Sequence, residues 1–236
     1  MMAAAAGCGL LPLGCVKEDA ASLGEQHDVA VQLNVGTRAV SEADGTPTDD
    51  ESAIHTLRVY AFVGGKPAGH YFTDNVADDP HTFFMDIAFY SADEQKVDFY
   101  AVANENAMIT SGSGAPAPLS EATTEAQLKN FWFTELSGDI QRNGLPMFCD
   151  NRSITLDFMK VKAESPNDPE HADHSWLNYS DITFELQRPV GKLGVFAAKP
   201  AGESGTLRIT GLTMLEAGTR MRNYLMTPTD DMLRGI

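Results

Sequence analysis

The sequence predicts an all-β protein, a β-sandwich of about seven or more strands with one short helix. Apolar and polar residues alternate with period two in many short segments, as in half-buried strands. Turn residues separate these segments at short intervals. One apolar and one polar face are typical of antiparallel sheets that cover each other, so we expect two packed sheets.

The predicted strands begin near the amino end. In Val29–Val35 every odd position is Val or Leu, and the even positions are Ala, Gln and Asn. The same alternation predicts strands at 57–63, 97–103, 154–158, 182–187, 193–197 and 207–209. Gly211 interrupts the last strand, and Leu212 and Met214 resume on the opposite parity, which indicates a β-bulge. Pro189 cannot donate to a ladder, so it marks a strand end or edge.

Only segment 124–132 has the pattern of a helix. Thr124 and Gln127 have the spacing of a capping box, and Leu128, Phe131 and Trp132 then share one face. The Gly/Pro-rich segment 111–118 and the acidic segments 41–51 and 164–174 are expected to be loops.

Composition and charge exclude several classes of protein. Of 236 residues, 43% are hydrophobic and 21% charged, so the chain can bury an ordinary core. The formal charge of −16 argues against a nucleic-acid partner, because phosphate binding depends on Lys and Arg. No paired carboxylates or nucleophile–base pair stand out, so we expect no enzyme and no cofactor.

The best candidate metal cluster is His171 and His174 with Asp168 and Glu170. A metal needs ligands in fixed geometry, whereas this segment is rich in Pro, Asn and Asp. We therefore expect a solvated loop and no metal site.

The first fifteen residues differ from the rest, because they carry no charged or hydroxyl side chain. An apolar segment that ends in Gly14-Cys15 is typical of a bacterial lipoprotein signal, with Cys15 as the lipidated residue. The segment lacks the basic start of a signal peptide, so an apolar disordered terminus is the alternative. If Cys15 is acylated and Cys8 is removed, only Cys149 remains, and a lone thiol is usually a small buried apolar group.

Arg38 and Ala39 follow the first predicted strand and precede the acidic segment 41–51. A single Arg in an exposed, extended segment is what a trypsin-like protease cuts, so Arg38 is a candidate for proteolytic processing. An ordinary solvated side chain is the alternative.

Six blocks of sequence carry a likeness to a known family by their order and spacing. They are Val29–Val35 with Thr37–Ala39, Ile54–Phe62, Val97–Glu105, Leu145–Met147, Phe184–Leu193 and Leu207–Thr213. Together they resemble the N-terminal domain of the major fimbrial subunit (fimbrillin) proteins of Bacteroidales, over residues 29–226. The resemblance implies a Greek-key, transthyretin-like sandwich at 29–226, after a signal-like segment at 1–15 and a linker at 16–28. Residues 227–236 would begin a missing C-terminal domain or tail.

The resemblance also implies a route of assembly. The precursor would be exported as a lipoprotein, acylated at Cys15 with a chain such as palmitate, and anchored in the outer membrane. An arginine-specific protease would cut after Arg38 and detach the first strand. Another fimbrial subunit would then donate a strand to the opened groove, and the product would be an extracellular fimbrium for cell adhesion.

The aliphatic row of the detachable strand makes this route physically plausible. Four side chains at about 1.5–3 kcal/mol each give about 6–12 kcal/mol on full burial. That range is comparable to the whole stability of a typical domain, about 5–15 kcal/mol. Loss of the strand would also leave a sheet edge, and an added strand could pair with it. The four residues are Val29, Val31, Leu33 and Val35.

Two alternatives remain open. Fimbrillins carry a second sandwich and a C-terminal donor segment, so this chain is expected to be a fragment or a one-domain relative, and an uncleaved anchor or tip subunit is the near variant. The other alternative is a lipid-anchored surface module that binds glycans or host proteins. Tyr60, Phe62, Tyr71 and Phe72 are candidate residues for such a site, and packing at strand edges is their alternative role.

Overall fold

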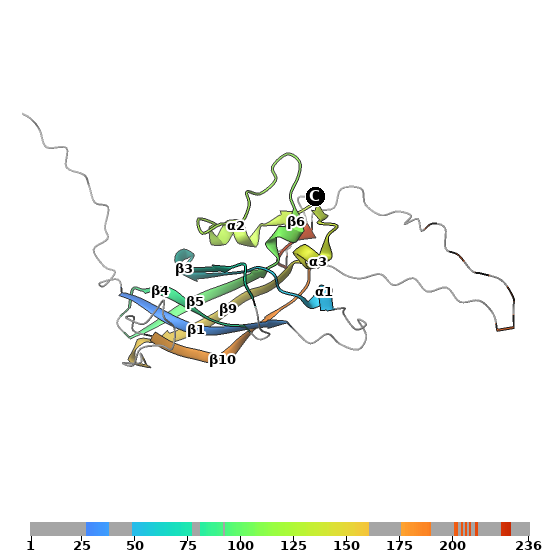
Figure 1. Cartoon of the computed structure of the whole chain (residues 1–236). Helices are drawn as coiled ribbons and strands as arrows, with labels where there is room; N and C mark the ends of the chain where they lie inside the picture. The colour runs from blue at the N-terminus through green and yellow to red at the C-terminus, as the bar shows by residue number, and fades with distance from the viewer. Residues whose placement is uncertain are drawn as a thin grey trace, which may run out of the picture.

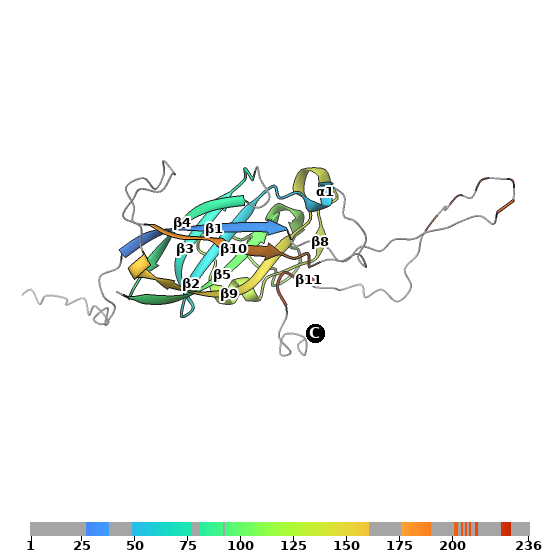
Figure 2. The same ribbon diagram turned by 90° about the horizontal axis from the view of Figure 1, so that it is seen from below.

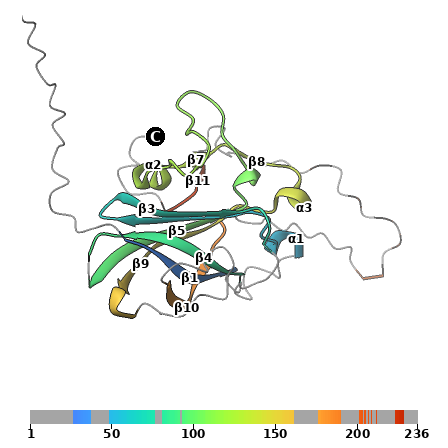
Figure 3. The same cartoon turned by 60° about the vertical axis from the view of Figure 1, so that its left-hand side comes forward.

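Two β-sheets face each other in the computed structural model, and a third layer of short elements covers the outer face of one sheet (Figure 1, Figure 3). The structure describes residues 27–37, 49–76, 81–91, 93–160, 176–189 and 223–227, with the single positions 201, 202, 204, 206, 208 and 211. The expected all-β sandwich is confirmed.

The smaller sheet holds the first strand in its middle. β1 (His27–Thr37) lies between β4 (His81–Phe89) and β10 (Trp176–Leu186). β1 pairs antiparallel with β4 but parallel with β10, and Figure 2 shows β1 and β10 pointing the same way. The expectation of antiparallel sheets is therefore wrong for this pair. Alternation does not reveal strand direction, and the long crossover between β1 and β10 permits a parallel pair.

The larger sheet has four antiparallel strands in the order β3-β2-β5-β9. Its strands are β2 (Leu57–Val63), β3 (Lys66–Thr73), β5 (Glu94–Ala103) and β9 (Met147–Asp157). Gly64 and Gly65 join β2 to β3 with φ of 56° and 82°, the left-handed conformation that a two-residue hairpin turn needs. The sequence predicted β2 at its observed bounds but did not predict β3.

The main core lies between the two sheets. Alternate residues of β1, β4 and β10 meet alternate residues of β2, β5 and β9 there. β3 passes close above β4 at Gly69, where a Cβ atom would come within 2.5 Å of the Asp86 carbonyl oxygen. Gly69 is needed for this close approach of the two sheets.

A second core lies on the outer face of the larger sheet. Tyr60, Phe62 and Tyr100 from the sheet are buried there against Leu128 of α2 (Glu125–Lys129). The capping box between Thr124 and Gln127 is confirmed. The helix is shorter than expected, because Asn130 ends it. The small strands of this layer are β6 (Met108–Ile109), β7 (Trp132–Phe133), β8 (Glu135–Leu136) and β11 (Asn223–Tyr224).

The expectation of a single helix is also wrong. Two further α-helices, α1 (Asp49–Ser52) and α3 (Ile140–Asn143), have one turn each. Two 3₁₀ helices follow β5 and β9, namely η2 (Glu105–Ala107) and η3 (Phe158–Lys160). Single turns are too short to show an amphipathic period in the sequence. Among the described residues, no helix is long and apolar enough to cross a membrane.

The predicted strands at 193–197 and 207–209 and the bulge after Gly211 rest on residues outside the described part of the chain. The domain limits 1–15, 16–28, 29–226 and 227–236 stay predictions.

Candidate functional site

The space between β4 and β10 that β1 fills, here called the β1 slot, holds the four aliphatic residues singled out in the sequence. Val29 is 1% exposed, and Val31, Leu33 and Val35 are 0% exposed. All four belong to the main core. The row therefore points between the sheets.

Neighbouring strands line the slot with matching apolar residues. Val29 pairs with Ile87, Val31 with Met85 and Leu33 with Phe83 on the β4 side. On the β10 side, Val31 pairs with Leu177 and Val35 with Phe184, whose ring lies 5.5 Å from that of Phe99. The slot is thus a continuous hydrophobic trough with β1 in it.

The central position of β1 corrects one expectation. The sequence predicted that loss of this strand exposes a sheet edge. β1 pairs with two strands, so its loss would expose two facing edges, one on β4 and one on β10. Two facing edges can hydrogen-bond an incoming strand on both sides.

Part of this site could have been predicted from the sequence, because β4 also has an alternating pattern, but no strand was predicted there. Phe83, Met85, Ile87 and Phe89 alternate along β4, and all four are buried. β10 was predicted only from residue 182, and its earlier part pairs with β1 through Trp176, Leu177 and Asn178.

Several sequence-predicted residues lie outside the described part of the chain. Cys15, Arg38 and Ala39 are among them, as are His171 and His174. β1 ends at Thr37, the residue before Arg38. Within the described residues, no group of three or more His, Cys, Asp or Glu side chains is placed to hold a metal.

Asn104 organises the loops at one end of the larger sheet. It is fully buried and has a left-handed backbone with φ of 58°. Its Oδ1 accepts hydrogen bonds from the backbone N–H groups of His55 (2.7 Å) and Thr56 (3.4 Å). Its Nδ2 donates to the carbonyl oxygens of Ala53 and Leu145, each at 2.8 Å. One side chain thus joins the segment before β2 to the segment after α3.

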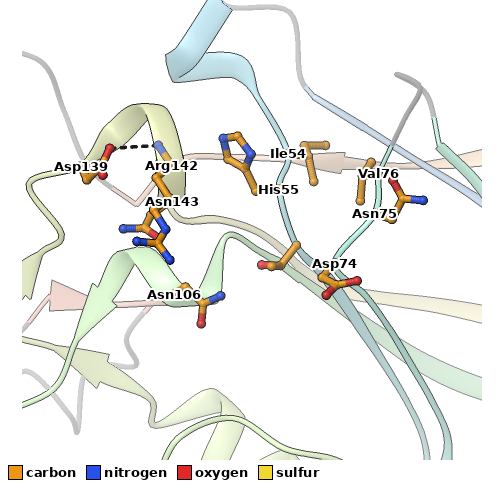
Figure 4. Close-up of a pocket in the computed structure, with 10 residues that line it drawn as sticks. Ile54, His55, Asp74, Asn75, Val76, Asn106, Asp139, Arg142 and Asn143 are labelled. Atoms are coloured by element: carbon orange, nitrogen blue, oxygen red, sulfur yellow. Dashed lines mark hydrogen bonds between the residues drawn. The ribbon is translucent and has the colours of Figure 1, made fainter.

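A polar cleft of about 720 Å³ lies beside Asn104. Figure 4 shows Asp139, Arg142 and Asn143 on one side, Asp74, Asn75 and Val76 on the other, and His55 between them. Ile54, Thr56 and Asn106 complete the lining. Thr56 is only 6% exposed, and its hydroxyl oxygen has no hydrogen-bond partner among the residues that the structure describes.

A buried ion pair ties η2 to the larger sheet. Arg58 Nε and Nη2 donate to the two carboxylate oxygens of Glu105, each at 2.7 Å. Arg58 Nη1 donates to His70 Nε2 at 2.7 Å, and its guanidinium lies 4.2 Å from the ring centre of Phe72. Burial acts to lower the pKa of Arg58, but the hydrogen bond and charge of Glu105 outweigh it and raise that pKa. Glu105 is therefore held by Arg58 in an ion pair that stabilises the fold.

The aromatic residues considered for a binding site do not form one exposed surface. Tyr60 and Phe62 are buried in the second core, where the Tyr60 hydroxyl donates to the Ser120 carbonyl at 3.0 Å. Tyr71 stacks on Phe83 at 4.4 Å, and Phe72 covers Arg58. Their observed role is packing.

Cys149 is a free thiol buried in the main core. Burial raises its pKa to about 11, so the thiol stays protonated at neutral pH. This environment agrees with a small apolar group.

The amino-acid sequence matches the sequence model of one protein family. The family is described as major fimbrial subunit protein (FimA), and the match covers residues 28–194. These residues include β4, β10 and all of β1 except His27, and hence the four aliphatic residues of the β1 slot. No curated protein matches the chain.

Three solved structures are similar to this chain over part of their length. A fimbrial assembly protein from Parabacteroides distasonis has a TM-score of 0.40 and 14% identity, over 70% of this chain and 53% of that one. The tip fimbrial protein Mfa3 from Porphyromonas gingivalis, with a C-terminal truncation, has a TM-score of 0.38 and 16% identity, over 69% of this chain and 48% of that one. A fimbrilin from Porphyromonas gingivalis has a TM-score of 0.36 and 14% identity, over 68% of this chain and 40% of that one. This chain spans only 40–53% of their lengths.

Proposed function

The chain belongs to the family of major fimbrial subunit proteins (FimA), and we propose that it is a fimbrial subunit precursor that assembles by exchange of β1. Members of this family are structural subunits of extracellular fimbriae and not enzymes. In the proposed route Cys15 carries a lipid that anchors the precursor in the outer membrane. An arginine-specific protease cuts between Arg38 and Ala39, β1 leaves its slot, and a strand of another fimbrial subunit replaces it.

The observation that supports this route best is the burial of four aliphatic side chains of a central strand. Each is at most 1% exposed, so the estimate of about 6–12 kcal/mol for their full burial applies. Loss of β1 would expose this trough together with the unpaired backbone groups of β4 and β10. An opened subunit needs a substitute strand of similar pattern, and β-augmentation supplies one.

Cleavage at Arg38 is tested by expressing Arg38→Ala and Arg208→Ala chains in the source bacterium. Arg208 is an exposed arginine outside the proposed junction, so its replacement is the matched control. We expect Arg208→Ala to enter surface fimbriae with Ala39 as its first residue, as mass spectrometry reads it. We expect Arg38→Ala to stay uncut and absent from fimbriae.

Entry of Arg38→Ala into fimbriae at the wild-type level would show that cleavage there is not required. A wild-type chain that retains its N-terminus in mature fimbriae would instead be an uncleaved anchor or tip subunit. Labelling with a palmitate analogue tests the anchor separately, because Cys15→Ala should then carry no label.

The polar cleft favours a second function, the binding of a glycan. Its lining carries one Arg and two Asp, a formal charge of 1 − 2 = −1, which favours neither strongly anionic nor strongly cationic ligands. Its Asn amides both donate and accept hydrogen bonds, as sugar hydroxyls do. The volume lies within the range of about 300–1,000 Å³ that ligand pockets occupy.

Glycan binding is tested on the full chain by saturation-transfer NMR with maltotriose, lactose and cellobiose in turn. If one of these binds the cleft, Arg142→Ala should weaken its binding about tenfold, because a hydrogen bond to a charged group is lost. Gln141→Ala is the control, since Gln141 lies in the same helix but outside the lining. Equal binding by both variants, or no binding of any sugar, would contradict this second function.

A further inference from the structure

Two aromatic rings meet across β1 on the outer face of the smaller sheet. Phe84 belongs to β4 and Trp176 to β10, and their ring centres are 5.9 Å apart at an angle of 63°. β1 lies between these two strands. The rings therefore pass over β1 on the face opposite its four aliphatic side chains.

The ring pair crosses β1 diagonally, because Trp176 is paired with Ala30 and Phe84 with Gln32. Ala30 itself lies between Trp176 on one side and Asp86 on the other. Because side chains alternate along a strand, Ala30 points away from the main core, yet it is 0% exposed. Gln32 and Asn34 share its face and remain partly exposed. The outer face is thus closed at Ala30 and more open further along β1.

This closure limits the size of the residue at that level. A side chain larger than Ala has no solvent-exposed space to enter, so it must displace a neighbour. The inner face of the slot discriminates less between strands, because alternating aliphatic residues that fit the trough are common in strands. The outer face also excludes, by steric overlap, those strands that carry a large side chain at the level of Ala30.

We infer that Phe84 and Trp176 select the strand that occupies the β1 slot by admitting only Gly, Ala or Ser at the level of Ala30. The partner is an extended segment with aliphatic side chains at the four alternate positions of Val29 to Val35. If it repeats the ladders of β1, it runs parallel to β10 and antiparallel to β4. The identity of this partner as a strand of another subunit rests on the proposed function, whereas the size limit concerns the slot itself.

The size limit is tested in the intact full chain by urea unfolding. We expect Ala30→Leu to move the unfolding midpoint to clearly lower urea, and Ala30→Ser and Gln32→Leu to stay close to wild type. Phe84→Ala should open space, so the double variant Ala30→Leu/Phe84→Ala should be more stable than the sum of its single effects predicts. A wild-type midpoint for Ala30→Leu, or strict additivity in the double variant, would overturn the inference.

Selection of an incoming strand is tested on the full chain after cleavage at Arg38. Labelled peptides with the sequence of residues 27–38 are added, and their binding is followed by fluorescence anisotropy. We expect the native and Gln32→Leu peptides to bind equally and the Ala30→Leu peptide to bind at least about tenfold more weakly, a difference of about 1.4 kcal/mol. Equal binding of all three would overturn the inference.

Binding of no peptide would refute exchange into the slot, and with it the selection of an incoming strand. The unfolding experiment would still decide whether the intact slot has the size limit. Failure of the size limit and failure of the proposed function are therefore distinguishable.

Discussion

At some positions of this fold a single residue must satisfy several hydrogen-bonding and packing partners at once. Asn104 makes four side-chain hydrogen bonds from a fully buried, left-handed position that Asn adopts more readily than most residues. Gly144 packs against it, and a Cβ atom at Gly144 would overlap the Asn104 amide. In the sequence Asn104 simply follows the predicted strand at 97–103, and its role is hidden because its partners lie about 40–50 positions away.

Replacing Asn104 should therefore be costly. We expect Asn104→Ala to lower the free energy of unfolding by about 3 kcal/mol, because partly buried backbone groups of His55, Ala53 and Leu145 lose their hydrogen-bond partners. Asn106→Ala, two positions later and exposed, should change it by less than about 0.5 kcal/mol. Urea unfolding of both variants measures the difference, and similar midpoints would show that Asn104 is not the anchor of these loops.

At the scale of elements, β1 combines an entirely buried inner row with a mixed outer face. The inner row follows from alternation, which the sequence displays without ambiguity at Val29–Val35. The closure over Ala30 does not, because it involves Phe84 and Trp176, whose rings two neighbouring strands bring together across β1. Adjacent residues of one strand thus have very different energetic roles.

Leu33 and Gln32 make this contrast measurable. We expect Leu33→Ala to cost about 3 kcal/mol of unfolding free energy, because it leaves a cavity in the main core. Gln32→Ala should cost less than about 0.5 kcal/mol. Calorimetry on the two variants tests this, and an equal loss for both would mean that the inner row does not dominate the stability contributed by β1.

At the scale of the whole molecule, the larger sheet lies between two cores. Its inner face meets the smaller sheet and its outer face meets the layer around α2 (Figure 3). Six of the seven residues of β2 are therefore buried. The network of Arg58, Glu105, His70 and Phe72 links β2, β3 and η2. Because it contains a histidine, this link depends on pH.

Burial, and then the charge of Arg58, hold the pKa of His70 below its usual value of 6.5. The unfolded chain therefore takes up the proton more readily than the folded protein does. Stability from neutral His70 is fully present above pH 6.5 and is lost as pH falls through the lowered pKa. We expect wild type to lose more stability than His70→Gln on acidification below pH 6.5, and parallel urea midpoints across that range would contradict this assignment.

Much of the fold could be predicted from alternation, including β1, β2, β5 and parts of β9 and β10, together with the cap of α2 at Thr124. β3 escaped prediction because it has no alternating row, since Pro67 and Gly69 interrupt it. The polar cleft could not be predicted, because four separate segments form it.

The sequence by itself determined which residues of β1 are apolar and that they share one face, because the geometry of a strand makes that face a local property. Only the tertiary structure decided that this strand is central, parallel to β10 and covered at Ala30. Those properties depend on which strands become neighbours, and strand pairing joins residues that are far apart in the chain.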